Sequence, residues 1–225
     1  MGGNVNSVKW KSDGDSLKTS FVTPDKSLLG NVSISKFKLE DSEIGVYQTD
    51  QLIKLLGVLG DKIELKLSKA GEQAVSLGIK NDSVSVNYVL SDLSVISEPP
   101  AMKRLPEFGT QIKLDRSFID TFIKGKSALS DVDTFTVVKT DSGCQVVIGY
   151  SSTNTNRVTI PVETETNDLS EPVSFNANLF KDVLVANKEC SSATLEVSND
   201  GLARINFKVD DYDSTYHIVA TQGVD

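Results

Sequence analysis

The sequence is poor in the side chains on which most catalytic and metal sites depend. Its 225 residues include one His, two Cys, two Met and one Trp. The two cysteines, Cys144 and Cys190, are isolated, so they form neither a disulfide framework nor a zinc-binding pattern, and we expect both to be small buried hydrophobic residues. With so few of these side chains, we expect no catalytic site, no metal and no bound cofactor.

The single histidine is a poor candidate for catalysis. His217 lies within an alternating run, residues 215–220. In a strand it would occupy the face opposite to the large apolar side chains, where we expect it to be solvated. A Ser-His-Asp site would need this residue in a buried and oriented position. The sequence therefore predicts a protein that is not an enzyme.

Two further motifs resemble binding loops but lack essential parts. Gly125-Lys126-Ser127 ends like a phosphate-binding loop, yet the glycine needed five residues earlier is Asp120. The acidic residues at 210, 211 and 213 lack the glycine and the distal glutamate of a calcium loop. We predict a helix end at the first motif and a hairpin turn at the second.

Membrane and export signals are also missing. No apolar run approaches the roughly 20 residues of a membrane-spanning helix. The N-terminal residues 1–4 do not begin the charged-then-apolar pattern of a signal peptide. Lys and Arg number 23 against 31 Asp and Glu, which gives a formal net charge of −8. We expect an intracellular protein located in the cytoplasm.

Most of the chain has the alternating pattern of short strands, and three stretches have the apolar spacing of helices. The first predicted helix spans 49–59, begins at the Thr49-Asp50 cap pair and ends near Gly57 or Gly60. The second spans 115–125, with Asp115 as cap and Gly125 as stop, and the third spans 176–187, with Asn176 or Asn178 as cap. The mixture indicates an α+β protein.

The two halves of the chain resemble each other. Residues 63–71 align with 193–201, and 52–54 align with 179–181 at almost the same spacing. Small insertions in loops explain the slight drift. The economical explanation is a duplicated unit of strands and one helix, and chance similarity between strand-rich segments is the alternative.

A proline-bearing segment separates the halves. Residues 97–109 contain Pro99, Pro100 and Pro106, which interrupt the strand pattern. We therefore predict a first domain over 1–98, a connector over 99–109 and a second domain over 110–225.

The first half lacks an element that the second half has. The second half opens with a strand at 111–114 and a helix at 116–124, whereas the first half starts at 8–11, which matches 137–140. About 20 to 25 residues of strand and helix have no counterpart in this alignment. Either the first domain lacks this element, or, as we expect, the upstream coding sequence supplies it.

Each predicted helix has an apolar stripe on one side and a lysine on another. Lys54 and Lys181 occupy aligned positions of the repeat, and Lys124 faces outward from the remaining helix. These can be ordinary solvated lysines. The sharper hypothesis is that they line a weakly basic surface that contacts phosphates without reading bases.

At residues 49–59, 97–109 and 112–118, and in the order of its repeats, the chain resembles the replicative DNA sliding clamps of T-even-type bacteriophages. The resemblance implies the DNA-clamp fold, with two similar domains and helices on one face of antiparallel sheets. It implies a homotrimeric ring around double-stranded DNA that tethers the DNA polymerase, is opened by an ATP-dependent clamp loader and supports late transcription. Rival hypotheses are a β-rich structural phage or virion assembly protein without a DNA role, and a small-ligand-binding β-protein.

The resemblance and the helix faces together propose the functional residues. The DNA-facing set is Lys54, Arg116, Lys124, Lys126, Lys181 and Lys188. Clamps of this family also have a hydrophobic pocket beside the connector that receives short partner peptides. Leu105, Pro106 and Phe108 are the matching residues here, and the alternative is that they pin the connector to the sheet.

Overall fold

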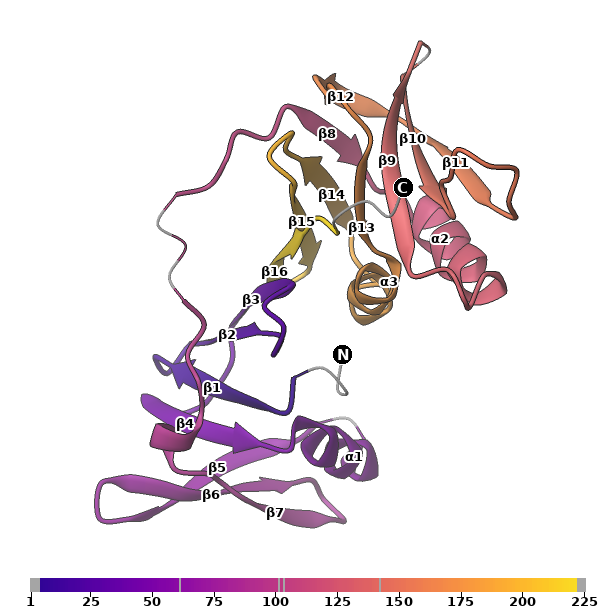
Figure 1. The fold of residues 1–225 in the computed structure, drawn as a ribbon. Coiled ribbons are helices and arrows are strands. Elements are labelled where there is room, and N and C mark those ends of the chain that lie inside the picture. The colour runs from indigo at the N-terminus through magenta and orange to yellow at the C-terminus, as the bar shows by residue number, and fades with distance from the viewer. Residues whose placement is uncertain (1–4, 61, 101, 103, 142, 222–225) are drawn as a thin grey trace. The chain divides into compact units, whose positions relative to one another are not determined.

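The structure is a computed structural model that describes residues 5–60, 62–100, 102, 104–141 and 143–221. Residues 1–4, on which the expectation about a signal peptide partly rests, lie outside this range. The chain divides into two compact units. Among the described residues, we call 5–24 and 31–100 the N-terminal unit, and 25–30 and 102–221 the C-terminal unit (Figure 1).

The N-terminal unit contains two antiparallel sheets and one helix. Its elements are β1 (Ser7–Ser12), β2 (Ser16–Val22), β3 (Leu28–Ser35, whose first residues belong to the other unit), β4 (Ser42–Tyr47), α1 (Thr49–Leu59), β5 (Glu64–Ala70), β6 (Gln73–Lys80), β7 (Ser85–Val89) and the 3-10 helix η2 (Leu93–Val95). The strand orders are β3-β2-β1-β4 and β5-β6-β7.

The C-terminal unit has the same plan with additional elements. Its elements are β8 (Thr110–Lys113), α2 (Arg116–Ala128), β9 (Thr134–Thr140), β10 (Gly143–Ile148), β11 (Val158–Val162), β12 (Thr164–Asn167), β13 (Val173–Asn176), α3 (Ala177–Ala186), β14 (Ser192–Val197), β15 (Leu202–Val209) and β16 (Tyr212–Val219). The strand orders are β11-β10-β9-β13 and β12-β8-β14-β15-β16.

The two units repeat one topology, as the sequence predicts. The order β3-β2-β1-β4 corresponds to β11-β10-β9-β13, and β5-β6-β7 corresponds to β14-β15-β16. One helix, α1 or α3, connects the two sheets of each unit. Strand β8 and helix α2 of the C-terminal unit have no counterparts in the described part of the N-terminal unit. That part has no strand on the outer edge of β5 and no helix before β1. The expectation that the upstream coding sequence supplies this strand and helix stays a prediction.

Side-chain caps determine where two of the helices begin. The Asp115 carboxylate accepts a hydrogen bond from the Phe118 amide at 2.6 Å, and Asn176 accepts one from the Leu179 amide at 3.0 Å. Such caps satisfy amides that have no partner inside the helix. Helix α1 differs, because Gln48 precedes it in a left-handed conformation (φ 59°) without a side-chain cap. The predicted Thr49-Asp50 cap is therefore wrong, although the helix bounds are as predicted.

The predicted end of α2 at Gly125 is also wrong. The helix continues to Ala128, and Gly125 is buried within it. A Cβ atom at this position would lie 3.1 Å from Val158 Cγ1 and 3.3 Å from Ile148 Cδ1. The glycine thus lets the helix approach β10 and β11 closely.

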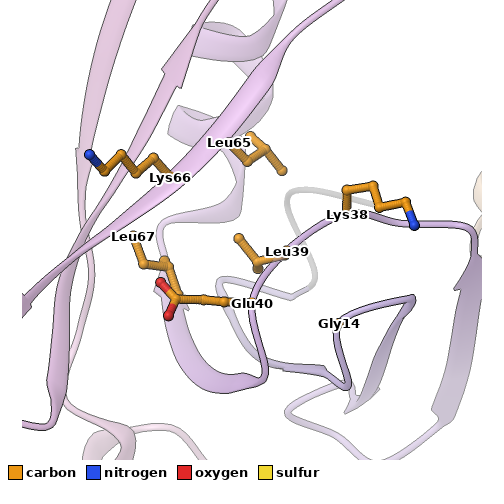
Figure 2. A pocket seen from close by; sticks show the side chains of 7 residues that line it. All are labelled: Gly14, Lys38, Leu39, Glu40, Leu65, Lys66 and Leu67. Carbon is orange, nitrogen blue, oxygen red and sulfur yellow. The ribbon is translucent and has the colours of Figure 1, made fainter.

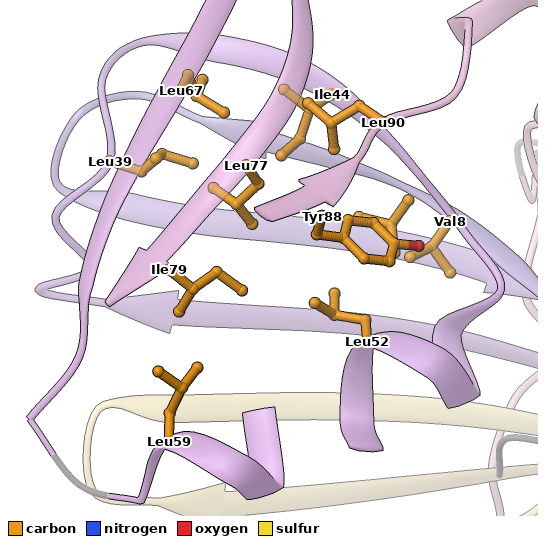
Figure 3. Close-up of a cluster of buried hydrophobic side chains, with 11 residues drawn as sticks. Val8, Leu39, Ile44, Leu52, Leu59, Leu67, Leu77, Ile79, Tyr88 and Leu90 are labelled. Carbon is orange, nitrogen blue, oxygen red and sulfur yellow. The ribbon is translucent and has the colours of Figure 1, made fainter. Parts of the chain in front are cut away.

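An aromatic cluster holds α2 and α3 side by side on one face of the β11-β10-β9-β13 sheet. The Phe180 ring of α3 lies 4.8 Å from Phe122 of α2 and 4.6 Å from Phe135 of β9, measured between centroids. Each such pair contributes about 0.5–1.5 kcal/mol beyond the burial of its area. The core of the N-terminal unit is instead mainly aliphatic, and Leu52 and Leu59 point into it from α1 (Figure 3).

His217 contradicts the expectation of a solvated position. Its side chain is 5% exposed, and neither ring nitrogen has a hydrogen-bond partner within the described residues. Burial, followed by the positive charge of Arg204, lowers the pKa of His217 below 6.5. The imidazole is therefore neutral near pH 7, and it packs as part of the interior.

Candidate nucleic-acid interface

The exposed side of α2 and α3 carries most of the predicted cations. Arg116 and Lys124 are exposed on α2, Lys181 is half-buried on α3, and Lys188 is exposed just after α3 ends. The two helices pack against each other through Phe118, Phe122 and Phe180, so their outer sides belong to one surface of the C-terminal unit. We call Arg116, Lys124, Lys181 and Lys188 the cationic face.

The start of α2 lies near the end of α3. Burial raises the pKa of the Cys190 thiol, and the positive charge of Arg116 partly opposes this rise. The Leu114 amide, two residues before Arg116, donates a hydrogen bond of 3.0 Å to the carbonyl of Ala193, three residues after Cys190, so the start of α2 lies near the segment that follows α3. This places two members of the cationic face near each other, although they are far apart in the sequence.

Acidic residues weaken this surface. Asp120 is exposed on α2, Asp182 is half-buried on α3, and Glu189 is exposed beside Lys188. A surface of mixed sign contacts a phosphate backbone weakly, and flexible lysines make point-charge contacts where arginines would make rigid bidentate ones. The cationic face is suited to weak, sequence-independent contacts and not to base recognition.

The N-terminal unit contributes one lysine at the equivalent place. Lys54 is exposed on α1, at the position of the repeat that Lys181 occupies on α3. Its neighbour Ile53 is 60% exposed. The equivalence of Lys54 and Lys181 follows from the repeat itself, because both follow the first buried leucine of their helix.

Lys126 does not have the exposed side chain that its predicted role requires. It is 3% exposed, and its ammonium group donates hydrogen bonds to the carbonyl oxygens of Leu129 at 3.3 Å and Ser130 at 3.0 Å. These carbonyls lie at the C-terminal end of α2, where a positive charge is favourable. We therefore correct the predicted set by removing Lys126.

The remaining five cations are available for external anions. Within the described parts of the chain, Lys54, Arg116, Lys124, Lys181 and Lys188 take part in no ion pair. Ion pairs involve other cations, for example Lys80 with Glu64 at 2.9 Å. Contact with a phosphate would therefore not require any of the five to leave a carboxylate partner.

Arg204 of β15 packs against the ring of the connector residue Phe108. The Arg204 guanidinium carbon lies 4.4 Å from the centroid of the Phe108 ring, and Glu196 binds Arg204 through two hydrogen bonds of 2.5 and 2.7 Å. These bonds raise the pKa of Arg204, with the Glu196 charge adding to the effect. Phe108 thus pins the connector, whereas Leu105 is 39% exposed. Pro106, between them, is half-buried.

The sequence analysis missed the contact between Phe108, Arg204 and Glu196. The Glu196–Arg204 pair could have been predicted, because these residues are directly opposite each other in the β14–β15 hairpin, whose turn contains Gly201. The stacking of Phe108 on Arg204 could not have been predicted, since it depends on where the connector runs over the folded sheet.

Comparisons with known proteins identify the fold. No family model matches the sequence, and no curated protein matches it. Solved structures do match: PCNA of A. fulgidus, with the C-terminal region of FEN-1 bound, superposes with a TM-score of 0.76 over 99% of this chain and 91% of that chain. The chain has the DNA sliding-clamp fold. The proliferating cellular nuclear antigen of Entamoeba histolytica gives the same TM-score over 97% of this chain and 91% of its own.

The clamp fold confirms the predicted fold class. Both similar structures are 16% identical to this chain, so the likeness concerns the fold. The resemblance to phage clamps in particular stays a prediction. In the described residues, no helix is long and apolar enough to cross a membrane. No group of three or more His, Cys, Asp or Glu side chains in that same part of the chain is placed to hold a metal ion.

Proposed function

We propose that this protein is a subunit of a sliding clamp, a ring that encircles double-stranded DNA and tethers the replicative DNA polymerase. The observation that carries the proposal is the clamp fold over nearly the whole chain. A tether of this kind acts by enclosing the duplex, so it needs no catalytic residue. An ATP-dependent clamp loader would open the ring.

The proposed DNA contacts are Lys54 and the cationic face. Isolated lysines attract phosphates without fixing a register, so a ring that uses them can move along DNA. The chain carries a net charge of −8, so its other surfaces repel nucleic acid. Weak attraction inside the ring and repulsion elsewhere favour sliding over static binding.

We propose further that three copies close the ring through strand edges. In the C-terminal unit, the Val219 amide at the end of β16 donates a hydrogen bond to the Ser27 carbonyl just before β3, at 2.9 Å. The repeat counterparts of β16 and β3 are β7 and β11, whose outer edges have no partner strand in the described residues. Pairing β7 of one copy with β11 of the next would use the same type of contact between copies.

We propose that short peptides of partner proteins bind beside the connector, where Leu105 is exposed and Pro106 is half-buried. The A. fulgidus PCNA structure contains a bound C-terminal region of FEN-1. The polymerase would use this site. If the phage resemblance holds, the late-transcription machinery would use it too.

The deciding experiment is a test of DNA topology. The purified protein is loaded onto nicked circular DNA with a competent clamp loader and ATP, and the complex is separated by gel filtration before and after the circle is cut. A sliding clamp stays on the circle and is lost from the linear product. Equal retention on both forms would indicate ordinary DNA binding, and no retention on circles would indicate a structural role.

A further inference from the structure

The groove beside β5 in the N-terminal unit has an expected occupant. Its lining includes Leu39, Leu65 and Leu67 (Figure 2). Strand β5 is the counterpart of β14, and β14 pairs with β8 in the C-terminal unit. The strand that we expect from the upstream coding sequence would therefore lie along this groove. The C-terminal unit has a different feature, a buried imidazole whose ring nitrogens bond to no described residue.

This imidazole, that of His217, lies in a row of side chains that crosses three strands. His217 is directly opposite Arg204 in the β15–β16 pair, and Arg204 is directly opposite Glu196 in the β14–β15 pair. Directly opposite residues of antiparallel strands point to the same face of the sheet, with Cβ atoms about 4.5–5.5 Å apart. The imidazole and the guanidinium group of Arg204 are therefore neighbours on one face, and Glu196 lies on the far side of Arg204.

The carboxylate of Glu196 is already bound by other donors. Its Oε2 accepts hydrogen bonds from Arg204 Nε at 2.5 Å and from Asn206 Nδ2 at 2.9 Å, and its Oε1 accepts one from Arg204 Nη2 at 2.7 Å. The side chain of His217 is 5% exposed, and within the described residues it has no partner of its own. A buried polar group without a partner is costly, and such a group calls for an explanation other than packing.

Two charged groups act on the imidazole. Burial lowers the pKa of His217 most, the positive charge of Arg204 lowers it further, and the negative charge of Glu196 opposes both. On its other side β16 lies next to β3, whose residues 28–30 in this unit have no titratable side chain. The connector contributes the exposed Glu107, next to Phe108. His217 therefore takes up a proton only below pH 6.5, and its new charge would face Arg204.

The side chain of Arg204 is the part of this row that can move. The backbones of β14, β15 and β16 are bonded to one another along their length, whereas the Arg204 side chain is 30% exposed. Like charges at directly opposite positions repel each other. The contact between Arg204 and the Phe108 ring, 4.4 Å from the guanidinium carbon to the centroid, is a weak one at a partly exposed site. A guanidinium group that moves into solvent would leave the Phe108 ring.

We propose that His217 is a pH-dependent latch for the connector. While the imidazole is neutral, Arg204 stays against Phe108. A proton on the imidazole displaces Arg204 and frees the connector at Phe108. The latch concerns the C-terminal unit alone and does not rest on the proposed DNA role. Its consequence for partner peptides does rest on the proposed function: a peptide site beside the connector would become sensitive to pH.

The test uses the fact that His217 is the single histidine of the sequence. The untagged full-length protein is labelled with carbon-13 in its histidine and phenylalanine rings for NMR. The Phe108 signal is the one that is missing from the Phe108→Ala protein. As the pH is lowered from 7.5 to 5.0, the His217 and Phe108 signals should move with one common midpoint below pH 6.5. The Phe108 signal should move toward its position in the Arg204→Gln protein, where the ring has no cation to stack on.

Substitutions separate the latch from a general effect of acid. His217→Gln keeps a polar side chain that does not titrate, so the Phe108 signal should stay constant over the same pH range. Coupling between two sites is reciprocal, so Phe108→Ala should raise the pKa of His217. Met102→Ala is the matched control, because Met102 is a connector residue that is 41% exposed, and it should leave the pKa of His217 unchanged.

Three results would each overturn the proposal. They are a Phe108 signal that does not move while His217 titrates, an equal movement in the His217→Gln protein, and equal effects of Phe108→Ala and Met102→Ala on the pKa of His217. The rings of Phe122 and Phe180, which pack against each other in the core of the same unit, report whether the fold persists. If their signals moved together with that of Phe108, the acid would be unfolding the whole unit, and the latch would be ruled out as well.

Discussion

At the scale of single residues, burial determines what each polar group of this protein can do. Lys126 and Lys124 are close in the sequence, yet one is 3% exposed with its ammonium group bound to two carbonyls and the other is exposed. The sequence predicted that the second helix ends at Gly125, so a helical wheel gave no direction for Lys126. Because α2 continues to Ala128, Lys126 lies within the helix and on its buried side, whereas Lys124 is exposed.

His217 makes stability depend on pH in a predictable direction. Its pKa in the folded protein is lowered below 6.5 by burial and by Arg204, so the unfolded chain takes up a proton at a pH where the folded chain does not. The stability that the neutral His217 contributes is present above pH 6.5 and is lost as the pH falls below that value. The urea concentration at the unfolding midpoint should therefore be lower at pH 5.5 than at pH 7.5, and His217→Gln should make this difference smaller. An equal fall in both proteins would contradict the assignment.

The stacking of Phe108 on Arg204 should hold the connector against proteases. Phe108→Ala removes the ring, so limited proteolysis should cut within residues 97–109 faster than in the unsubstituted protein. A double-mutant cycle with Arg204→Gln should give a coupling of about 1 kcal/mol, as expected for a partly exposed cation–π contact. Leu105→Ala is the control, because Leu105 is exposed and should leave stability unchanged. Additive effects of Phe108→Ala and Arg204→Gln would show that the contact carries no energy.

At the scale of elements, the sequence predicts best what depends on local pattern. The bounds of α1 and the caps of α2 and α3 follow from spacing and from Asp115 and Asn176. The end of α2 was not predictable, because Gly125 is required by contact with strands far along the chain. The cations on the helix faces could be predicted for the same local reason, whereas the Phe108–Arg204 contact could not.

Two helix glycines should respond oppositely to substitution. Gly57 in α1 has no atom within 4 Å of the place where a Cβ would lie, so Gly57→Ala should stabilise the N-terminal unit by up to about 1 kcal/mol. Gly125→Val would press into Val158 and Ile148 and should destabilise the C-terminal unit by about 1–3 kcal/mol. Chemical denaturation of both variants measures the difference. Similar effects at the two positions would contradict the close packing of α2.

The helix-borne cations should determine how DNA binding depends on salt. Replacing Lys54 and Lys181 together by Ala removes two proposed phosphate contacts per chain, and each lost contact lowers the slope of log affinity against log salt by about 0.9. Lys208→Ala is the control, because Lys208 is exposed on β15 and outside the proposed set. The measurement is non-specific duplex binding at several salt concentrations. An equal change of slope in the control would mean that any surface lysine suffices.

At the scale of the whole molecule, the contact between β16 and β3 within one chain predicts how several chains assemble, because β7 and β11 are the repeat counterparts of these strands. If β7 of one copy pairs with β11 of the next, then Val89, which is 71% exposed at the end of β7, lies at that junction. Val89→Asp places a charge beside a strand edge that must lose water on pairing, so sedimentation should shift from trimer to monomer and retention on circular DNA should be lost. Val95→Asp is the matched control, since Val95 is 63% exposed on η2 and outside both edges. A trimer that survives Val89→Asp, or a monomer before any substitution, would rule out ring closure through these strands, because the interface would then lie elsewhere or not form.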